Sequence, residues 1–237
     1  MLTFVLTNLP TMTAISEQTK EKLVFAPGCA LMLYKPELAD KLLSILDENL
    51  GGVELLLTCC QHDPKIKENT KVINVCPGCD KRFAKDYAGV STISLWEILA
   101  ETDFFKFPNY HGSKMSIIDA CPTRDKASVQ DAIRVLLTKM NISLVEPEKT
   151  RSKSTCCGDG FYGEIPVDQV KEQMIKRTSE MPEENVVVYC VSCGKSVFIG
   201  GKQPQYMIDL LFDNETIRKT YEPDEWHAEL RSYIEAH

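Results

Sequence analysis

The sequence lacks long apolar runs, low-complexity stretches and any block of charge of one sign. Residues 1–9 are apolar, but Thr and Asn interrupt them and no basic segment precedes them, so they resemble neither a membrane span nor a signal peptide. The net charge is -7, and acidic and basic residues alternate along the chain. These absences argue against a nucleic-acid groove and a membrane-binding face. We expect a cytoplasmic protein with no nucleic-acid partner and no membrane span.

A nucleotide-cofactor fingerprint is also missing. The paired glycines Gly51-Gly52 and Gly200-Gly201 lack the spacing that a dinucleotide-binding loop needs. If the chain performs redox chemistry, we therefore expect its electrons to come from another protein.

Cysteine is the residue type that stands out. The sequence has 10 cysteines, and they form two sets that each read single Cys, Cys-Cys, then Cys-x-x-Cys. The first set is Cys29, Cys59, Cys60, Cys76 and Cys79, and the second is Cys121, Cys156, Cys157, Cys190 and Cys193. Iron–sulfur clusters are bound by cysteine thiolates at characteristic sequence spacings, so both sets are candidate metal ligands.

Three other interpretations of the cysteines remain open. A disulfide framework suits small secreted domains, whereas this chain has 237 residues and is 43% hydrophobic, enough to build its own core. Zinc favours Cys-x-x-Cys pairs, but a structural zinc site closes at four ligands and each set offers a fifth. A redox dithiol would use only the Cys-x-x-Cys pairs and leave the other cysteines unexplained.

The rest of the chain repeats with the cysteines, which indicates an internal duplication. Apolar runs at 22–26, 53–57 and 71–75 in the first copy, and at 115–120, 142–145 and 185–189 in the second, predict strands, most of them ending at a cysteine. Helices are predicted at 36–50 and 128–140 and at the ends of the copies, 94–100 and 205–211. Alternating strands and helices favour an α/β fold of two tandem halves with small parallel sheets, whose cysteine loops gather at the C-terminal ends of the strands.

The two copies differ in one segment. Between Cys157 and Cys190 lie 32 residues that include a predicted helix at 167–180, whereas 15 residues separate Cys60 from Cys76. That interval is too short for a helical crossover, so the first site should be open to solvent or to a partner. We expect an N-terminal extension at 1–21, a shortened first domain at 22–112, a second domain at 113–212 and a helical tail at 213–237.

The second cysteine set resembles the CCG (cysteine-rich) motif found in the cysteine-rich subunit of heterodisulfide reductase and in its relatives, which include iron–sulfur subunits of lactate- and glycolate-oxidising systems. The resemblance covers about residues 22–212 and rests on the spacing of the second set and on the run Cys-Cys-Gly-Asp-Gly-Phe at 156–161. It implies Rossmann-like halves, each holding a non-cubane four-iron four-sulfur cluster on its five cysteines. Gln61 stands where the family has glycine, so the first site departs from the pattern.

The resemblance also implies a function. The chain would be a redox subunit of an anaerobic complex that reduces a small disulfide or related substrate, with electrons from an iron–sulfur or flavoprotein subunit. We expect Gly158 and Gly160 to be small because the loop wraps closely around the cluster and offers backbone N–H groups to it. His62, two residues after Cys60, is a candidate ligand or proton donor. The alternatives are a non-catalytic electron-transfer subunit of an organic-acid dehydrogenase complex and a zinc-binding structural or assembly protein.

Overall fold

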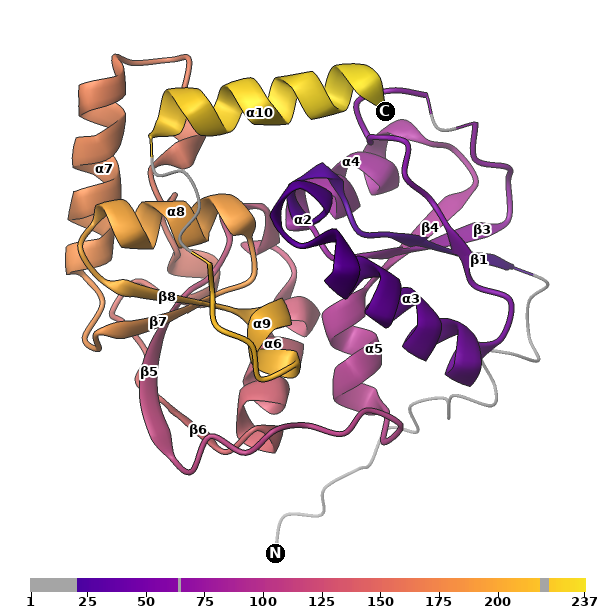
Figure 1. Cartoon of the computed structure of the whole chain (residues 1–237), viewed down its shortest axis with the longest axis horizontal. Coiled ribbons are helices and arrows are strands. Elements are labelled where there is room, and N and C mark those ends of the chain that lie inside the picture. Colours follow the sequence, from indigo (N-terminus) through magenta and orange to yellow (C-terminus); the bar gives the residue numbers. More distant parts are fainter. Residues whose placement is uncertain (1–20, 64, 218–221) are drawn as a thin grey trace, which may run out of the picture.

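The computed structural model describes residues 21–63, 65–217 and 222–237, and these form two α/β halves (Figure 1). Each half contains a parallel four-stranded sheet, with strand orders β2-β1-β3-β4 and β6-β5-β7-β8. The two orders are the same when the strands are numbered within each half. The predicted fold class is therefore confirmed. The proposed N-terminal extension, apart from Glu21, lies outside the described residues.

The first half contains the predicted strands and helices, and in addition α2, α4 and β4, which the sequence pattern did not predict. Its elements are β1 (Lys22–Ala26), α2 (Cys29–Tyr34), α3 (Pro36–Leu50), β2 (Glu54–Leu55), β3 (Thr70–Asn74), α4 (Pro77–Asp86), β4 (Val90–Ser94) and α5 (Leu95–Glu101). Proline at the first position of α3 and Gly51, with φ of 72°, after its last residue fix both ends of that helix. A capping box at Ser94 and Glu97 starts α5.

The second half repeats this plan with two differences, a 3-10 turn at Cys121–Thr123 in the place of α2 and an additional helix between β6 and β7. Its elements are β5 (Ser113–Ile118), α6 (Ala127–Lys139), β6 (Ile142–Leu144), α7 (Val167–Ser179), β7 (Asn185–Val188), α8 (Val191–Ile199), β8 (Gln203–Tyr206) and α9 (Met207–Leu211). The additional helix is α7, which has no counterpart among the described residues between Cys60 and Cys76. That difference matches the one expected from the sequence spacing.

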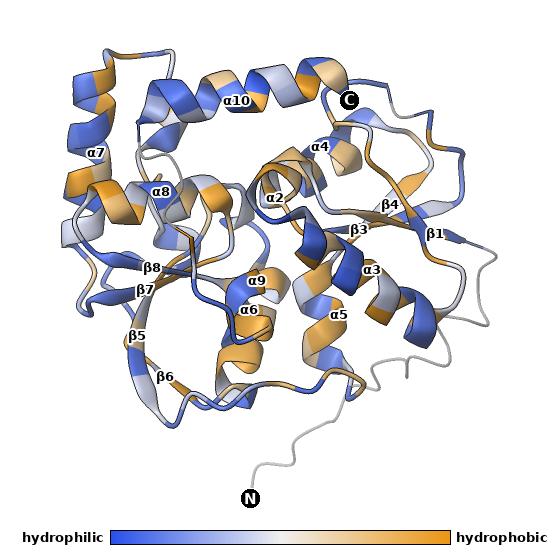
Figure 2. Ribbon diagram, in the orientation of Figure 1, coloured by the Kyte–Doolittle hydropathy of each residue, from blue (hydrophilic) through white to orange (hydrophobic). Residues whose placement is uncertain are grey.

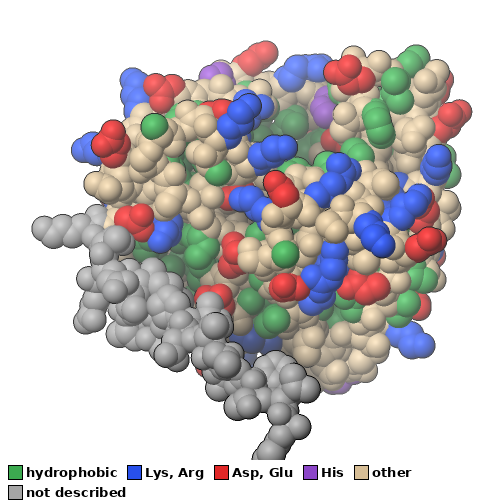
Figure 3. Space-filling model, turned by 180° about the vertical axis from the view of Figure 1, so that it is seen from behind, with side chains coloured by type: hydrophobic (Ala, Val, Ile, Leu, Met, Phe, Trp, Pro, Cys, Tyr) green, Lys and Arg blue, Asp and Glu red, His purple; other side chains and the backbone are tan. Residues whose placement is uncertain are grey.

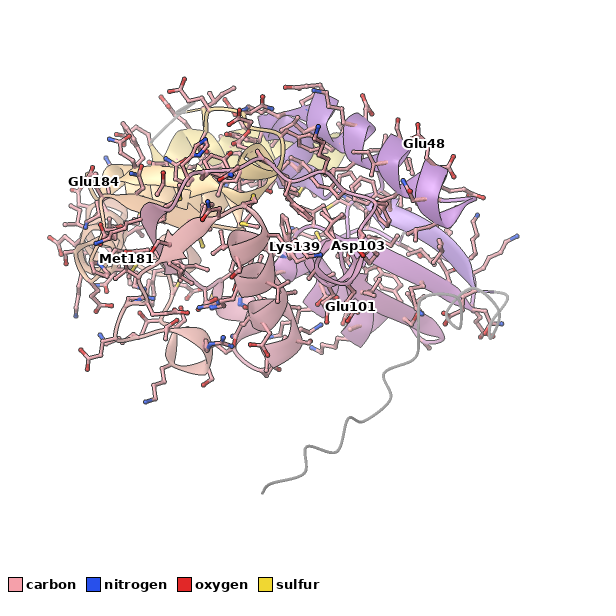
Figure 4. The ribbon with its side chains drawn as sticks, turned by 90° about the horizontal axis from the view of Figure 1, so that it is seen from below. Glu48, Glu101, Asp103, Lys139, Met181 and Glu184 are labelled. Atoms are coloured by element: carbon pink, nitrogen blue, oxygen red, sulfur yellow. The ribbon has the colours of Figure 1, made fainter. Side chains whose placement is uncertain are left out.

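One continuous core joins the halves. Helices α5 and α6 pack against each other between the two sheets, and buried side chains from both halves, such as Phe25, Trp96 and Ile117, belong to a single cluster. Apolar residues concentrate on the inner faces of α3, α5 and α6 (Figure 2). At one end of this interface, Lys139 lies beside Asp103, as the view from below shows (Figure 4). The Nζ of Lys139 donates a hydrogen bond of 3.0 Å to the carbonyl oxygen of Thr102. The two sheets therefore have fixed positions relative to each other.

The tail forms helix α10 (Pro223–Ala236), which runs across both halves (Figure 1). The spacing of Trp226, Leu230, Tyr233 and Ile234 predicts this helix, and Trp226 is buried. None of the helices in the described ranges has the length and apolar character needed to cross a bilayer. On the face shown in Figure 3, acidic and basic side chains are interspersed.

Candidate metal centres

The two cysteine sets occupy equivalent places in the two halves. In the first half, Cys29 begins α2 just after β1, Cys59 and Cys60 lie in the loop after β2, and Cys76 and Cys79 lie at the start of α4 after β3. In the second half, Cys121 begins a 3-10 turn after β5, Cys156 and Cys157 precede another such turn, and Cys190 and Cys193 lie at the start of α8 after β7. Because the strands are parallel, their C-terminal ends bring five thiols together in each half.

The sulfur atoms contact one another in the same sequence in both halves. The thiol of Cys60 lies 3.5 Å from that of Cys79. In the first half the hydrogen-bonded run is Cys29, Cys59, Cys60, Cys79 and Cys76, and in the second it is Cys121, Cys156, Cys157, Cys193 and Cys190. All of these cysteines are free thiols. Within the described part of the chain, no group of three or more Cys, His, Asp or Glu side chains is arranged to hold a single metal ion.

The first cysteine of each adjacent pair is the thiolate of its set. Hydrogen bonds from Cys29 and Cys60 lower the pKa of Cys59 to about 2. Hydrogen bonds from Cys121 and Cys157 lower the pKa of Cys156 to about 2 as well. Each set thus presents an anionic sulfur flanked by two thiol donors, and a thiolate is the form of cysteine that binds metal.

The pKa values of the donor thiols move in the opposite direction. The hydrogen bond to Cys59 and burial raise the pKa of Cys29, and the hydrogen bond to Cys156 and burial raise that of Cys121. The hydrogen bond from Cys79 lowers the pKa of Cys76 to about 7. Binding of a metal cluster at either set would therefore release protons from the raised thiols.

The glycines after the second Cys-Cys pair are packed against their surroundings. Gly158 has φ of 112°, and a Cβ there would lie 2.7 Å from the backbone nitrogen of Met174 in α7. Its own N–H lies 3.4 Å from the sulfur of Cys156. A Cβ on Gly160 would lie 2.9 Å from the same sulfur. Only glycine at both positions leaves room for the loop to pass close to the sulfur of Cys156 and for α7 to pack against the loop.

A buried carboxylate organises the second site. Asp119, at the end of β5, accepts hydrogen bonds from Arg134 of 2.6 and 2.8 Å and from Tyr189 of 3.1 Å. Burial raises its pKa, but the hydrogen bonds and charge of Arg134 outweigh burial, so the pKa is lowered. Tyr189 immediately precedes Cys190, and its hydroxyl also lies 2.8 Å from that of Thr123, two residues after Cys121. This network fixes three cysteine-bearing segments relative to one another.

Among the described residues, the first site has no equivalent of the Asp119 network, although the Tyr87 hydroxyl donates a hydrogen bond of 2.8 Å to the carbonyl oxygen of His62. Pro27 and Val75 occupy the places of Asp119 and Tyr189, so neither can hydrogen-bond through its side chain. The N–H of Gln61 and the nearby His62 help to lower the pKa of Cys59. The His62 ring is exposed, and its Nε2 lies 2.8 Å from the carbonyl oxygen of Ile234 in α10. His62 therefore lies at the rim of the first site, not among its sulfurs.

The open side of the first site is partly apolar. Leu55 and Leu57, which lead to Cys59, are 37% and 40% exposed. A cleft beside the thiols is lined by Met32, Leu56 and Phe83 and has about 10 Å³ of free space, room for about one water molecule.

Two ion pairs tie the sites across the boundary between the halves. Lys35, which follows Cys29, contacts Asp209 of α9 at 2.5 Å, and both side chains are buried. Lys126, which follows Cys121, pairs with Asp80, the residue after Cys79. Each pair therefore links a cysteine segment of one half to the other half.

Comparison with known proteins adds little to this geometry. No protein-family model matches the chain, and no curated protein matches it. Among solved structures, it is similar to an aspartate racemase of Picrophilus torridus, with 11% identity over 90% of this chain and 99% of that one and a TM-score of 0.34. A likeness of this degree carries no argument about fold or function.

Proposed function

We propose that the chain is an iron–sulfur redox subunit that resembles the cysteine-rich subunit of heterodisulfide reductase and reduces a disulfide or related substrate with electrons from a partner protein. The observation that carries the proposal is the repeated run of five contacting thiols at the C-terminal edge of each sheet. Clusters of this kind are held by cysteine thiolates. Each run contains one cysteine with a strongly lowered pKa, and two neighbouring thiols donate hydrogen bonds to it.

The donor set supports a polynuclear cluster over a single zinc ion. A structural zinc ion is satisfied by four ligands in a tetrahedron, so a fifth thiol in each set would be left over. Five thiols in a run can instead reach several iron atoms, which gives the adjacent cysteines of each pair separate partners.

Reduction of a disulfide takes two electrons and two protons and yields two thiols. A bound cluster would supply the one-electron chemistry. Cys29, Cys59, Cys60, Cys76 and Cys79 would hold the first cluster, and Cys121, Cys156, Cys157, Cys190 and Cys193 the second.

The residues around the sulfurs would bind and protonate the substrate. The exposed Leu55 and Leu57 would contact its apolar part. His62 uses Nε2 to donate to Ile234, so Nδ1 carries a transferable proton only in the imidazolium form.

The electron donor would be another iron–sulfur protein or a flavoprotein, because the sequence has no nucleotide-binding fingerprint of its own. We place the chain in the cytoplasm of an anaerobic cell, where the thiols stay reduced. A non-catalytic electron-transfer subunit would use the same cysteines and differ only in lacking turnover of a disulfide.

The experiment is anaerobic purification followed by measurement of iron, sulfide and zinc per chain and by electron paramagnetic resonance. About eight irons with matching sulfide supports two four-iron clusters, and about four supports one. Zinc without sulfide overturns the proposal. Turnover of a disulfide with a reduced dye then separates the enzyme from the electron-transfer protein.

A matched pair of variants assigns the metal to its site. Cys60→Ser and Cys157→Ser remove the same member of each set. If both sites hold a cluster, each variant loses about half of the iron. If only Cys157→Ser loses iron, the first set holds none.

A further inference from the structure

Helix α10 contacts cysteine-bearing segments of both halves. It packs on α2, which begins at Cys29, and on α7, and it passes over the loops that hold Cys59 and Cys157 (Figure 1). Its residues belong to neither of the two duplicated units. The helix therefore covers both sites from outside the fold that builds them.

The beginning of α10 is held firmly on the second half. Trp226 is buried, its Nε1 donates a hydrogen bond of 3.1 Å to Ser192 between the cysteines of α8, and Lys195 lies 4.4 Å from the centre of its ring. His227 lies 3.0 Å from Asp159 and stacks on Tyr162 with a centroid distance of 3.7 Å. This end combines burial, stacking and charge.

The last turns of α10 contact the first half without a fully buried side chain such as Trp226. The backbone N–H of Cys59 donates to the carbonyl oxygen of His237 over 3.4 Å, and His62 contacts that of Ile234. Tyr233 is half-buried beside the first thiols, where burial and the charges of Cys29 and Cys59 raise its pKa. This contact consists of two hydrogen bonds, the partly buried Tyr233 ring, Leu230 on the core and the packing of the helix on α2.

The second site has a cover of its own that the first cannot have. Helix α7 packs on α8 at Ser196, whose carbonyl accepts a hydrogen bond from Thr178, and at Gly200, where a Cβ would lie 2.3 Å from the Cβ of Thr178. The equivalent residues of α4, counted from the second cysteine of each Cys-x-x-Cys, are Arg82 and Asp86, and both are exposed. Large charged side chains occupy the place where a helix like α7 would pack.

We propose that the C-terminal half of α10 is the detachable cover of the first cysteine site, and that it lifts about the Trp226 anchor while the second site stays covered. This movement breaks the contacts of α10 with Cys59 and His62 and leaves α7 closed over Cys156 and Cys157. The inference concerns the protein fold and holds whether or not the sites bind iron.

Hydrogen–deuterium exchange on the full chain tests the cover. Tyr233→Ala removes the ring that seats the last turns, and Glu229→Ala on the exposed side of the same helix is the control. We expect amide exchange in residues 58–63 to become about tenfold faster in Tyr233→Ala. Exchange in residues 156–162 should change by less than about twofold, and Glu229→Ala should change neither segment.

Two outcomes overturn the proposal. If both cysteine loops exchange faster together, α10 is a brace for the whole molecule, and if neither changes, it does not cover the first site. His62→Ala, at an exposed position, gives a second variant in case Tyr233→Ala fails to fold, and the same selective increase is expected from it. Iron content does not enter the measurement, so failure of the proposed function leaves this result interpretable.

Discussion

The two halves carry the same run of five thiols but support it differently. In the second half, the Asp119 network ties the cysteine segments together and α7 packs over the Cys-Cys loop against Gly158. In the first half, Pro27 and Gln61 replace the residues that make these contacts possible, and exposed loops surround the cysteines. The same pattern of cysteines is therefore held by a hydrogen-bond network and a covering helix in the second half, and lacks both among the described residues of the first half.

This difference indicates that the halves have diverged in their tasks. Metal sites whose ligands are fixed by surrounding hydrogen bonds hold one geometry, whereas loosely supported ligands can rearrange when a ligand binds. Regions that open locally have few buried contacts and exposed backbone hydrogen bonds, which describes the first site. Under the proposed function, the second half would store or relay electrons and the first half would admit the ligand.

The largest expected effect is loss of the buried carboxylate of the second half. Asp119→Ala leaves Arg134, whose side chain is 12% exposed, with only Glu146 as an ionic partner. Breaking a buried pair from one side costs about 4 kcal/mol, which urea unfolding would detect. Glu54→Ala removes the exposed Lys22 pair of the first half and should cost about 0.5 kcal/mol or less. Similar losses of unfolding free energy in the two variants would mean that the stability of the second half does not depend on the Asp119 network.

The next largest effect is expected from substitution of the residue that follows each Cys-Cys pair. Gly158→Ala places a Cβ against the backbone of Met174 at a φ that alanine avoids, and we expect a loss of about 3 kcal/mol in unfolding free energy. Gln61→Ala changes an exposed side chain at the equivalent position and should alter stability by about 0.5 kcal/mol at most. A mild Gly158→Ala would show that α7 can move away from the loop, and the contrast between the halves would weaken.

Local signals in the sequence were sufficient to predict most of the fold. Helix α3 matches its predicted bounds because Pro36 and Gly51 mark its ends. Strand β2 is shorter than the predicted 53–57, and Leu57 beyond its end is 40% exposed. The predicted helix at 205–211 begins only at Met207, because Gln203–Tyr206 pairs with β7 as a strand. Strand pairing depends on residues distant in the chain, so the local pattern does not specify it.

The candidate sites were predictable in their ligands but not in their support. Cysteine spacing and the parallel topology together predict that each set converges, and each does. The Asp119 network could not be predicted, because Arg134 and Tyr189 approach it from separate elements and no local spacing marks the contact. For the same reason, the sequence predicts helix α10 but not the surface on which it packs.

A smaller effect tests how firmly the halves hold each other. Lys126→Met breaks the pair with Asp80 across the boundary, and the lysine side chain is 31% exposed. Because solvent screens this pair, we expect a loss of about 1 kcal/mol in urea unfolding. Lys22→Met in the more exposed pair with Glu54 serves as the control. A loss of unfolding free energy close to that of Asp119→Ala would show that the contact between the halves stabilises the molecule as much as the Asp119 network does.

The smallest expected effect concerns the open edge of the first half. Leu57 is 40% exposed and precedes Cys59 by two residues, on the side where the second half is covered by α7. If this edge is open in solution, Leu57→Ser should change the unfolding free energy by about 0.5 kcal/mol or less, because the side chain buries little surface. Circular dichroism during urea unfolding, at several protein concentrations, measures it. A loss above about 1.5 kcal/mol would mean that Leu57 is buried in solution. If that loss grows with protein concentration, a second copy covers the edge, and the first half is then supported from outside the chain as the second is from within.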